Sequence, residues 1–290
     1  MIRSILLLAP FAAVASAAAA QPQPRVGMVS DPCEALAVAV PDAVRAYFYA
    51  RMAMPQTRTP PPPELAVYRL ANAEARKSDW PDLCRYHADN ERLRAGPKSE
   101  RRVVFIGDSI TELWVLGDPD LFSKSIVNRG ISGQTSPQIL LRFQADVVAL
   151  QPVIVHILAG TNDIAGNTGP TSTDQYKDNI KAMVSLAKSN GIKVILGSIP
   201  PAAHFPWKPD LKPVPQIAAL NDWLRSYAEA EKLEFVDYHA ALTTRDGAIN
   251  DGFSFDGVHL NLRGYRLMTR AVRRSLPAEA GPSLKNRPVP

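Results

Sequence analysis

Short apolar runs and longer amphipathic stretches alternate from Arg102 onward, and this alternation restricts the fold of the 290-residue chain more than any other feature. Runs of strand length, rich in β-branched residues, are expected at 102–106, 124–128, 153–158, 192–198 and 234–237. Helical stretches are expected at 136–149, 173–189, 215–232 and 262–275. Alternation of this kind is typical of a parallel sheet with helices on both faces. The sequence therefore predicts an α/β fold.

The first 20 residues have the pattern of a secretory signal peptide. A basic Arg3 precedes an apolar stretch and an alanine-rich end, so we expect cleavage after Ala20, although the alanine run also permits Ala17. A membrane anchor is the alternative. However, Pro10 interrupts the apolar stretch, which is shorter than the roughly 20 residues that span a bilayer. We therefore expect export to the periplasm or beyond, without a stable membrane anchor.

The region between the signal peptide and residue 100 shows helical spacing and no recognisable chemistry. A proline-rich connector at 55–63 divides it, and we expect a stiff linker there. The last residues are polar and rich in proline, which is typical of a mobile tail. The predicted organisation is a signal peptide, a helical N-terminal extension, a catalytic domain and a flexible tail, at 1–20, 21–100, 101–276 and 277–290.

Cys33 and Cys84 are the two cysteines of the chain. An exported protein meets oxidising conditions, which favours a disulfide between them over two buried thiols. The bond would close a loop of about 50 residues and contribute roughly 3–4 kcal/mol. Two cysteines without a neighbouring histidine cluster do not indicate a metal site.

The charge of the chain does not indicate nucleic-acid binding. Lysine and arginine total 33 against 28 acidic residues, a formal net charge of +5, and the basic residues are scattered rather than clustered. The sequence does not indicate an oligomeric state.

Ser109 lies where the first predicted strand passes into a helix, in the stretch 102–114. A hydroxyl at this junction stands at the carboxyl end of a strand, where open α/β sheets bind their ligands. Its backbone N–H lies at a helix N-terminus and faces any developing negative charge. A simple helix N-cap is the alternative reading of this stretch alone.

Three further segments carry polar residues after predicted strands or in loops, at 128–135, 159–163 and 255–260. Acyl transfer needs a nucleophile, a base, a group that orients the base, and donors for the oxyanion. Asp256 and His259 are three residues apart, so a single turn can bring carboxylate and imidazole together. The backbone N–H groups of Ser109 and Gly133, with the side-chain amide of Asn162, would form the oxyanion hole. Each segment alone also fits an ordinary turn.

Together, these four segments resemble the sequence blocks of the SGNH, or GDSL, hydrolase superfamily, over about residues 101–275. The resemblance implies a flavodoxin-like three-layer αβα fold with about five parallel strands. It also implies that Ser109 is the nucleophile and that Asp256 and His259 complete the catalytic triad. The oxyanion hole would be formed by Ser109, Gly133 and Asn162. Residue 134, often acidic in relatives, is Gln134 here and is not a catalytic position. Thr111 replaces the second glycine of a Gly-x-Ser-x-Gly elbow, so the chain does not match α/β-hydrolases.

Four other histidines are less suitable bases, because His259 alone has a carboxylate three residues before it. His156 lies inside an apolar strand and is expected in the core. His239 follows the last predicted strand and is a weaker second candidate. His204 lies in a proline-rich loop, and His87 lies in the N-terminal extension.

The resulting hypothesis is a serine esterase or acylhydrolase that acts on a small-molecule ester. Its substrates could include lysophospholipids or thioesters. The mechanism calls for no metal and no organic cofactor. A carbohydrate O-deacetylase is the alternative enzyme, and a non-catalytic binding module is the alternative of another class. Release of nitrophenol from a short-chain ester distinguishes a module from an enzyme. The loop 200–215, which carries Phe205 and Trp207, is expected to wall the substrate pocket. Trp114, in the helix that follows Ser109, is a further candidate for the pocket, and a core position is the equally supported alternative for it.

Overall fold

The computed structural model describes residues 27–122 and 125–277. The expected signal peptide and most of the expected tail lie outside these residues. The chain divides into a short unit, Met1–Pro32, and a main unit, Cys33–Pro290, which contains the whole sheet. No helix in the described ranges combines the length and the apolar character needed to cross a membrane.

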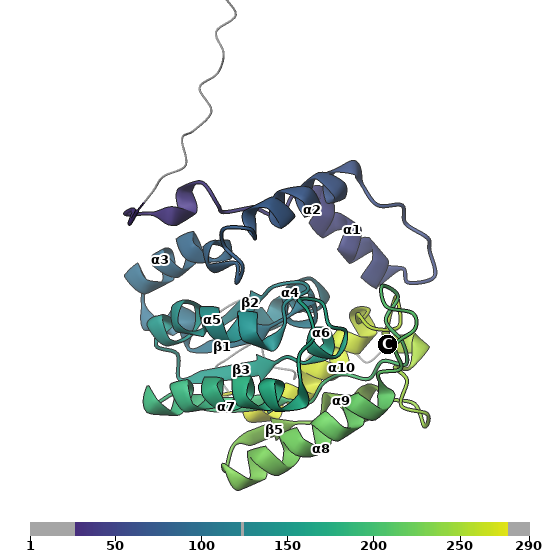
Figure 1. The fold of residues 1–290 in the computed structure, drawn as a ribbon. Coiled ribbons are helices and arrows are strands. Elements are labelled where there is room, and N and C mark those ends of the chain that lie inside the picture. The colour runs from purple at the N-terminus through teal and green to yellow at the C-terminus, as the bar shows by residue number, and fades with distance from the viewer. Residues whose placement is uncertain (1–26, 123–124, 278–290) are drawn as a thin grey trace, which may run out of the picture. The chain divides into compact units, whose positions relative to one another are not determined.

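The main unit is built on one five-stranded parallel sheet (Figure 1). Its strands, in the spatial order β2-β1-β3-β4-β5, are β2 Ile126–Gly130, β1 Val103–Gly107, β3 Ile154–Leu158, β4 Lys193–Gly197 and β5 Glu234–Val236. This order is that of the flavodoxin-like fold, whose ligands bind where the strand order reverses, between β1 and β3. The predicted α/β class and flavodoxin-like sheet are confirmed.

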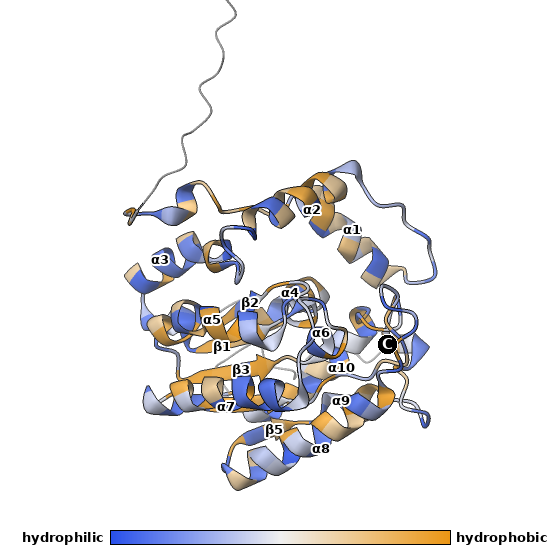
Figure 2. Ribbon diagram, in the orientation of Figure 1, coloured by the Kyte–Doolittle hydropathy of each residue, from blue (hydrophilic) through white to orange (hydrophobic). Residues whose placement is uncertain are grey.

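Helices cover both faces of the sheet, so the fold has three layers. Alternate residues of β1 enter opposite cores: Val104 and Ile106 pack in one, Val103 and Phe105 in the other. Both sides of β1 and β3 are therefore apolar, and both strands are orange in Figure 2. The helices of this region are α4 Ser109–Gly117, α5 Ser136–Asp146, α6 Thr161–Ile164, α7 Thr173–Ser189, α8 Val214–Ala230, α9 Tyr238–Leu242 and α10 Leu262–Val272.

Three α-helices precede the sheet: α1 Asp42–Ala53, α2 Pro63–Ala75 and α3 His87–Ala95. Helices α1 and α2 follow Pro41 and Pro62, whose fixed φ suits a helix start. Met52 of α1 is fully buried in the core that also contains Trp114 of α4. The N-terminal helices therefore pack directly on the part of the domain that begins with Ser109.

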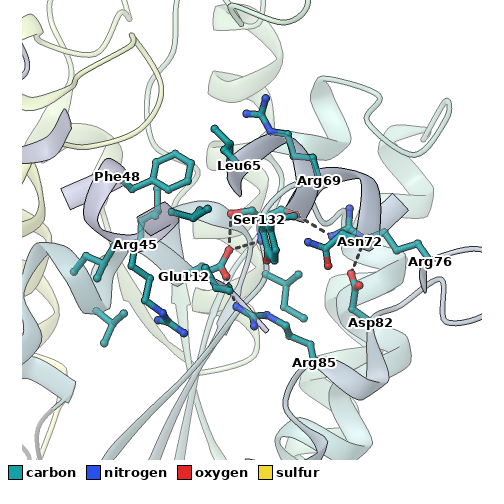
Figure 3. Close-up of a pocket in the computed structure, with 18 residues that line it drawn as sticks. Arg45, Phe48, Leu65, Arg69, Asn72, Arg76, Asp82, Arg85, Glu112 and Ser132 are labelled. Atoms are coloured by element: carbon teal, nitrogen blue, oxygen red, sulfur yellow. Dashed lines mark hydrogen bonds and ion pairs between the residues drawn. The ribbon is translucent and has the colours of Figure 1, made fainter. Parts of the chain in front are cut away.

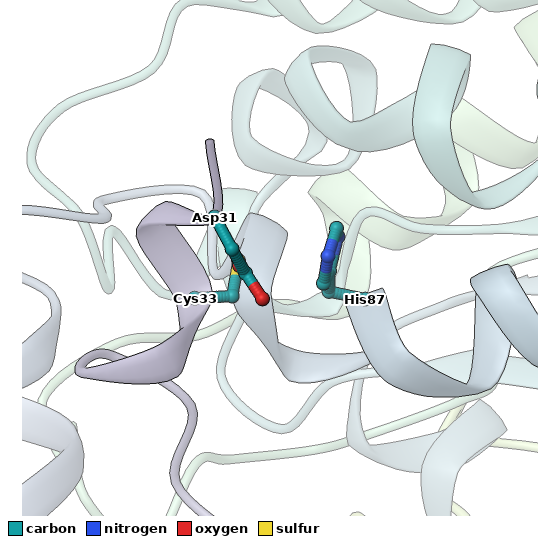
Figure 4. A group of neighbouring side chains, drawn as sticks. All are labelled: Asp31, Cys33 and His87. Atoms are coloured by element: carbon teal, nitrogen blue, oxygen red, sulfur yellow. The ribbon is translucent and has the colours of Figure 1, made fainter. Parts of the chain in front are cut away.

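A disulfide joins Cys33 to Cys84 across 51 positions of sequence. Cys33 lies near His87 in Figure 4, but its sulfur is bonded to Cys84 and does not offer a thiolate ligand to a metal. The bond ties the beginning of the main unit to the segment between α2 and α3.

Arg142 of α5 is completely buried and joins the carboxyl ends of two strands. Its guanidinium donates to the carbonyl oxygens of Gly107 in β1 and Arg129 in β2, at 2.9 and 2.8 Å. It also pairs with Asp146 at 2.8 Å and donates to Gln134 Oε1 at 2.6 Å. A buried charge is tolerated when its donors are satisfied in this way. Arg142 thus fixes the sheet edge from which the polar loops emerge.

Candidate active site

Ser109 is the first residue of α4, directly after β1. A side chain at Gly107 would place its Cβ 2.3 Å from Thr111 Oγ1 and 2.4 Å from the Leu158 carbonyl oxygen, so glycine is required for this close approach. Asp108 then caps the helix, because its Oδ1 accepts a hydrogen bond from the Ile110 N–H at 2.9 Å. The strand, the glycine and the cap together fix the position of Ser109.

The structure brings Ser109, His259 and Asp256 into one hydrogen-bonded row. Ser109 Oγ lies 3.0 Å from His259 Nε2, and His259 Nδ1 lies 2.8 Å from Asp256 Oδ2. The imidazole is therefore positioned to accept a proton from the hydroxyl while the carboxylate fixes its tautomer.

The loop that carries Asp256 and His259 is held by its own hydrogen bonds. Asp256 Oδ1 accepts from the backbone N–H groups of Val258 and His259, at 3.1 and 2.7 Å. Gly257 between them has a φ of +85°, a left-handed conformation that favours glycine. Burial raises the pKa of Asp256, but the hydrogen bonds and charge of His259 and the Val258 N–H outweigh burial and lower it below the usual range. The carboxylate stays ionised beside the imidazole.

The expected oxyanion donors lie in two neighbouring loops and at the start of α4. Gly133 has a φ of +82°, and a Cβ placed there would meet no atom within 4 Å, so the backbone is open to a ligand. Within the described residues, neither the Ser109 nor the Gly133 backbone N–H donates a hydrogen bond. Unpaired donors of this kind are available to a developing negative charge.

The side-chain amide of Asn162 lies between these loops. Its Nδ2 donates to the Gln134 carbonyl oxygen at 3.0 Å and to Asp108 Oδ2 at 3.3 Å, next to Gly133 and Ser109 in sequence. Its Oδ1 accepts from Asn167 Nδ2 at 2.6 Å, and this bond turns the NH₂ group of Asn162 toward the site.

The carboxyl of Asp108 accepts a hydrogen bond from Asn162 at 3.3 Å. Complete burial raises its pKa to about 7, although the Ile110 N–H and the charge of His259 lower it. The protonation of Asp108 therefore changes near neutral pH, at an oxygen that contacts Asn162.

Glu112, one turn after Ser109, holds the loop of Gly133. Its Oε2 accepts from the Ser132 N–H and hydroxyl at 2.8 and 2.5 Å, and its Oε1 accepts from Arg85 at 2.8 Å. Arg76 donates to the Ser132 carbonyl oxygen at 3.3 Å. Because that carbonyl and the Gly133 N–H belong to one planar peptide group, these bonds orient the expected oxyanion donor.

Two of the three expected pocket residues are instead in the core. Trp114 is fully buried, makes an edge-to-face contact with Phe105 and donates its indole N–H to Thr269 Oγ1 at 3.0 Å. Phe205 is also fully buried, beneath the ring of Trp207. Trp114 therefore takes the core position that was its alternative, and the expectation that Phe205 lines the site is wrong, because apolar packing removes both rings from the surface.

Trp207, the third expected pocket residue, lies beside His259. The residue is 39% exposed, and the centroid of its ring lies 6.0 Å from that of His259. Its indole N–H donates to Asn167 Oδ1 at 2.9 Å, and Asn167 in turn donates to Asn162. Trp207 therefore connects the loop 200–215 to the amide of Asn162.

In the described residues, His156 and His239 form no hydrogen bond with Ser109. His156 Nε2 lies 2.8 Å from the Tyr238 hydroxyl, and burial lowers its pKa to about 3, so the ring is neutral and structural. His239 lies on α9, where burial lowers its pKa, and in the described residues no hydrogen bond joins its ring to Ser109.

Sequence reasoning did not identify four residues that support this site: Asn167, Glu112, Arg85 and Arg76. Arg76 and Arg85 are far from Ser109 in sequence, and only the packing of the N-terminal helices places them nearby. Glu112 stands at i+3 from Ser109, a spacing that predicts a shared helix face. Asn167 follows Asn162 in a loop and carries no comparable periodic signal.

A hydrogen-bonded row of serine, histidine and aspartate at the carboxyl edge of a parallel α/β sheet is an arrangement that cleaves acyl bonds with a serine nucleophile. A sequence model of the GDSL-like lipase/acylhydrolase family matches residues 105–267. The chain belongs to this family and is a hydrolase of ester bonds.

Individual relatives agree with this assignment. Platelet-activating factor acetylhydrolase IB subunit alpha1 of Bos taurus is 30% identical over 192 residues, which cover 61% of this chain and 75% of that protein. The solved structure of a GDSL-like lipase from Bacteroides thetaiotaomicron is 45% identical, has a TM-score of 0.64, and aligns over 67% of this chain and 97% of its own. The isoamyl acetate-hydrolyzing esterase of Saccharomyces cerevisiae is 28% identical over 160 residues, 49% of this chain and 64% of that enzyme.

Proposed function

We propose that the protein is a serine-dependent carboxylic ester hydrolase that forms an acyl-enzyme on Ser109. The observation that carries the proposal is the continuous row from Ser109 Oγ to His259 Nε2 at 3.0 Å and from His259 Nδ1 to Asp256 at 2.8 Å. This row supplies the nucleophile, the base and the orienting carboxylate in the required order.

In the acylation step, Ser109 Oγ attacks the ester carbonyl carbon while His259 accepts the hydroxyl proton. The N–H groups of Ser109 and Gly133 donate to the negative oxygen, and the Asn162 hydrogen that is donated to Asp108 Oδ2 at 3.3 Å turns to it as a third donor. His259 then gives its proton to the leaving alcohol oxygen as the bond to carbon breaks. Water repeats the sequence on the acyl-enzyme, releases the acid and restores the Ser109 hydroxyl.

The first prediction tests Ser109 directly. Ser109→Ala should reduce hydrolysis of p-nitrophenyl acetate by several orders of magnitude, because the acyl-enzyme is not formed. An organophosphonate probe should add one adduct to the native protein, located by peptide mass spectrometry on Ser109. Ser275, whose hydroxyl is tied to Glu234 at the surface, provides the control variant Ser275→Ala, which should retain activity and labelling. Wild-type turnover by Ser109→Ala would exclude the proposed nucleophile.

The names of two relatives favour simple acetate esters as a starting point for assays, since one is called an acetylhydrolase and another hydrolyses isoamyl acetate. An O-acetylated sugar remains the second enzyme hypothesis. A panel of acetylated sugars, alkyl acetates and lysophospholipids, assayed by acid release, decides between these classes.

We also propose that the protein is exported, with cleavage near Ala20. The disulfide between Cys33 and Cys84 supports export, since such bonds persist in oxidising compartments. The intact mass and N-terminal sequence of the protein recovered from a periplasmic fraction test the proposal, and an uncleaved cytosolic chain would contradict it.

A further inference from the structure

A cavity of about 290 Å³ lies where α1 and α2 face α4 (Figure 3). Its apolar wall comes from both sides: Val44 and Phe48 of α1, Leu65 of α2, Leu113 and Leu116 of α4, and Ile131 after β2. Helices α1 and α2 precede the segment that matches the family model, residues 105–267, so the N-terminal region supplies one wall of the cavity.

The cavity borders the groups that are proposed to perform the chemistry. Ser109, Glu112, Leu113 and Leu116 stand at i, i+3, i+4 and i+7 of α4, and such positions share one helix face. The last three line the cavity, which places its wall on the same face as the nucleophile. Gly133, the expected oxyanion donor, also lines it.

The direction of the cavity identifies which part of an ester would occupy it. During acylation the leaving alcohol oxygen must lie at His259 Nε2 to receive its proton. The acyl substituent of the same carbon then points away from His259. No residue of the His259 loop, 254–260, or of the Trp207 loop, 200–215, is among the described residues that line the cavity.

The charged groups in the wall are largely paired with one another. Arg85 binds Glu112, and Arg76 binds Asp82, both at 2.8 Å. Arg45 and Arg69, the other two arginines of the wall, are exposed at the surface, and the guanidinium of Arg69 points away from Glu112 in Figure 3. The two inner ion pairs neutralise each other's charge, although Arg85 Nε is buried without a hydrogen-bond partner in the described residues. The space between the apolar side chains therefore favours a hydrocarbon group over an ion.

We propose that this cavity is the acyl pocket of the enzyme and that its substrates carry apolar acyl groups larger than acetyl. The inference rests on the proposed function of Ser109 and adds the substrate class and a role for α1 and α2. An apolar cavity of roughly 150 Å³ holds a benzene ring, so this cavity has room for a medium-length chain or a substituted ring.

The test compares kcat/KM for p-nitrophenyl acetate and p-nitrophenyl octanoate, the latter below its aggregation concentration. Each methylene that enters an apolar site contributes roughly a fourfold gain, so burial of even two gives a wild-type preference for octanoate of about tenfold or more. Leu65→Trp fills the cavity from α2 and should reduce the octanoate-to-acetate ratio at least tenfold. Leu116→Trp, from the opposite wall, should do the same.

Leu70→Trp is the matched control. Leu70 lies on the same helix as Leu65, is 73% exposed, and does not line the cavity, so its replacement should leave both rates unchanged. Far-UV circular dichroism establishes that each variant is folded. The acyl pocket would be overturned if the wild type preferred the acetate ester. It would also be overturned if the octanoate-to-acetate ratio of kcat/KM were unchanged in folded Leu65→Trp and Leu116→Trp. Either result would leave the esterase proposal intact.

Failure of the proposed function gives a different result. Absence of ester turnover in the wild type, or turnover that survives Ser109→Ala, would overturn the role of Ser109. Calorimetric binding of octanoate to Ser109→Ala then tests the cavity by itself. Leu65→Trp in the same background should weaken that binding at least tenfold, and unchanged affinity would overturn the site.

Discussion

Asn162 is held by three hydrogen bonds of its carboxamide, and its NH₂ group faces the loops of Ser109 and Gly133. Asn162→Ala should lower kcat by roughly 10²–10³ with a smaller change in KM, because an oxyanion donor acts on charge that develops only in the transition state. Steady-state kinetics on one soluble ester measure the effect. A change confined to KM would show that Asn162 binds the ground state of the substrate.

The titration of Asp108 should make the free energy of unfolding of the protein depend on pH. Its folded-state pKa of about 7 exceeds the roughly 3.9 of an unfolded aspartate, so the folded state binds the proton more tightly. The stability that the protonated carboxyl contributes is complete below about pH 4 and is lost as the pH rises through 7.

Asp108→Asn keeps an oxygen that can cap α4 and removes this titration. Between pH 4 and 7, the free energy of unfolding of the wild type should fall relative to that of Asp108→Asn by at most about 1.4 kcal/mol per pH unit. Urea unfolding at pH 4.5, 5.5 and 7 gives the slope of each protein. Parallel slopes would show that Asp108 is ionised throughout this range.

At the scale of the element, α4 depends on its close approach to β2. A Cβ at Gly130 would lie 2.1 Å from the Glu112 backbone nitrogen and 2.6 Å from its Cα, so the helix backbone rests directly on this glycine. Gly130→Ala should lower the free energy of unfolding by about 1–3 kcal/mol or more, because the helix must move.

The displacement should also lower esterase activity, since Ser109 begins the same helix. Gly96→Ala is the matched control, because a Cβ there would approach no atom closer than 3.4 Å. Thermal unfolding and p-nitrophenyl acetate hydrolysis of both variants measure the two effects. If Gly130→Ala and Gly96→Ala unfolded at the same temperature, α4 would be able to move away from β2 without loss of stability.

At the scale of the whole molecule, the Cys33–Cys84 bond closes a 51-residue separation that includes α1 and α2. The chain-entropy account assigns about 4 kcal/mol to such a loop. Replacement of both cysteines by serine should therefore lower Tm by on the order of 10 °C. The measurement is calorimetry of the oxidised protein and the double variant, and an unchanged Tm would mean that the segment is held by packing alone.

The repeating parts of the fold were predictable from sequence because they depend on local periodicity. The helix expected at 173–189 was found as Thr173–Ser189, between a Ser172 cap and the Asn190–Gly191 stop. The strand expected at 124–128 was found as Ile126–Gly130. Arg129, although charged, is buried in that strand because Asn90 and Asp89 of α3 bind its guanidinium, a contact that no local pattern shows.

The sequence by itself determined the alternation of strands and helices, the junction at Ser109 and the spacing of Asp256 and His259, since each depends on neighbouring residues. Tertiary structure decided which aromatic side chains are available to a ligand: Trp114 and Phe205 entered the cores, and Trp207 stayed beside His259. It also decided that α1 and α2 form one wall of the cavity next to Gly133. Contacts between segments far apart in sequence form where two apolar surfaces bury each other from water, and only the folded chain determines which surfaces meet.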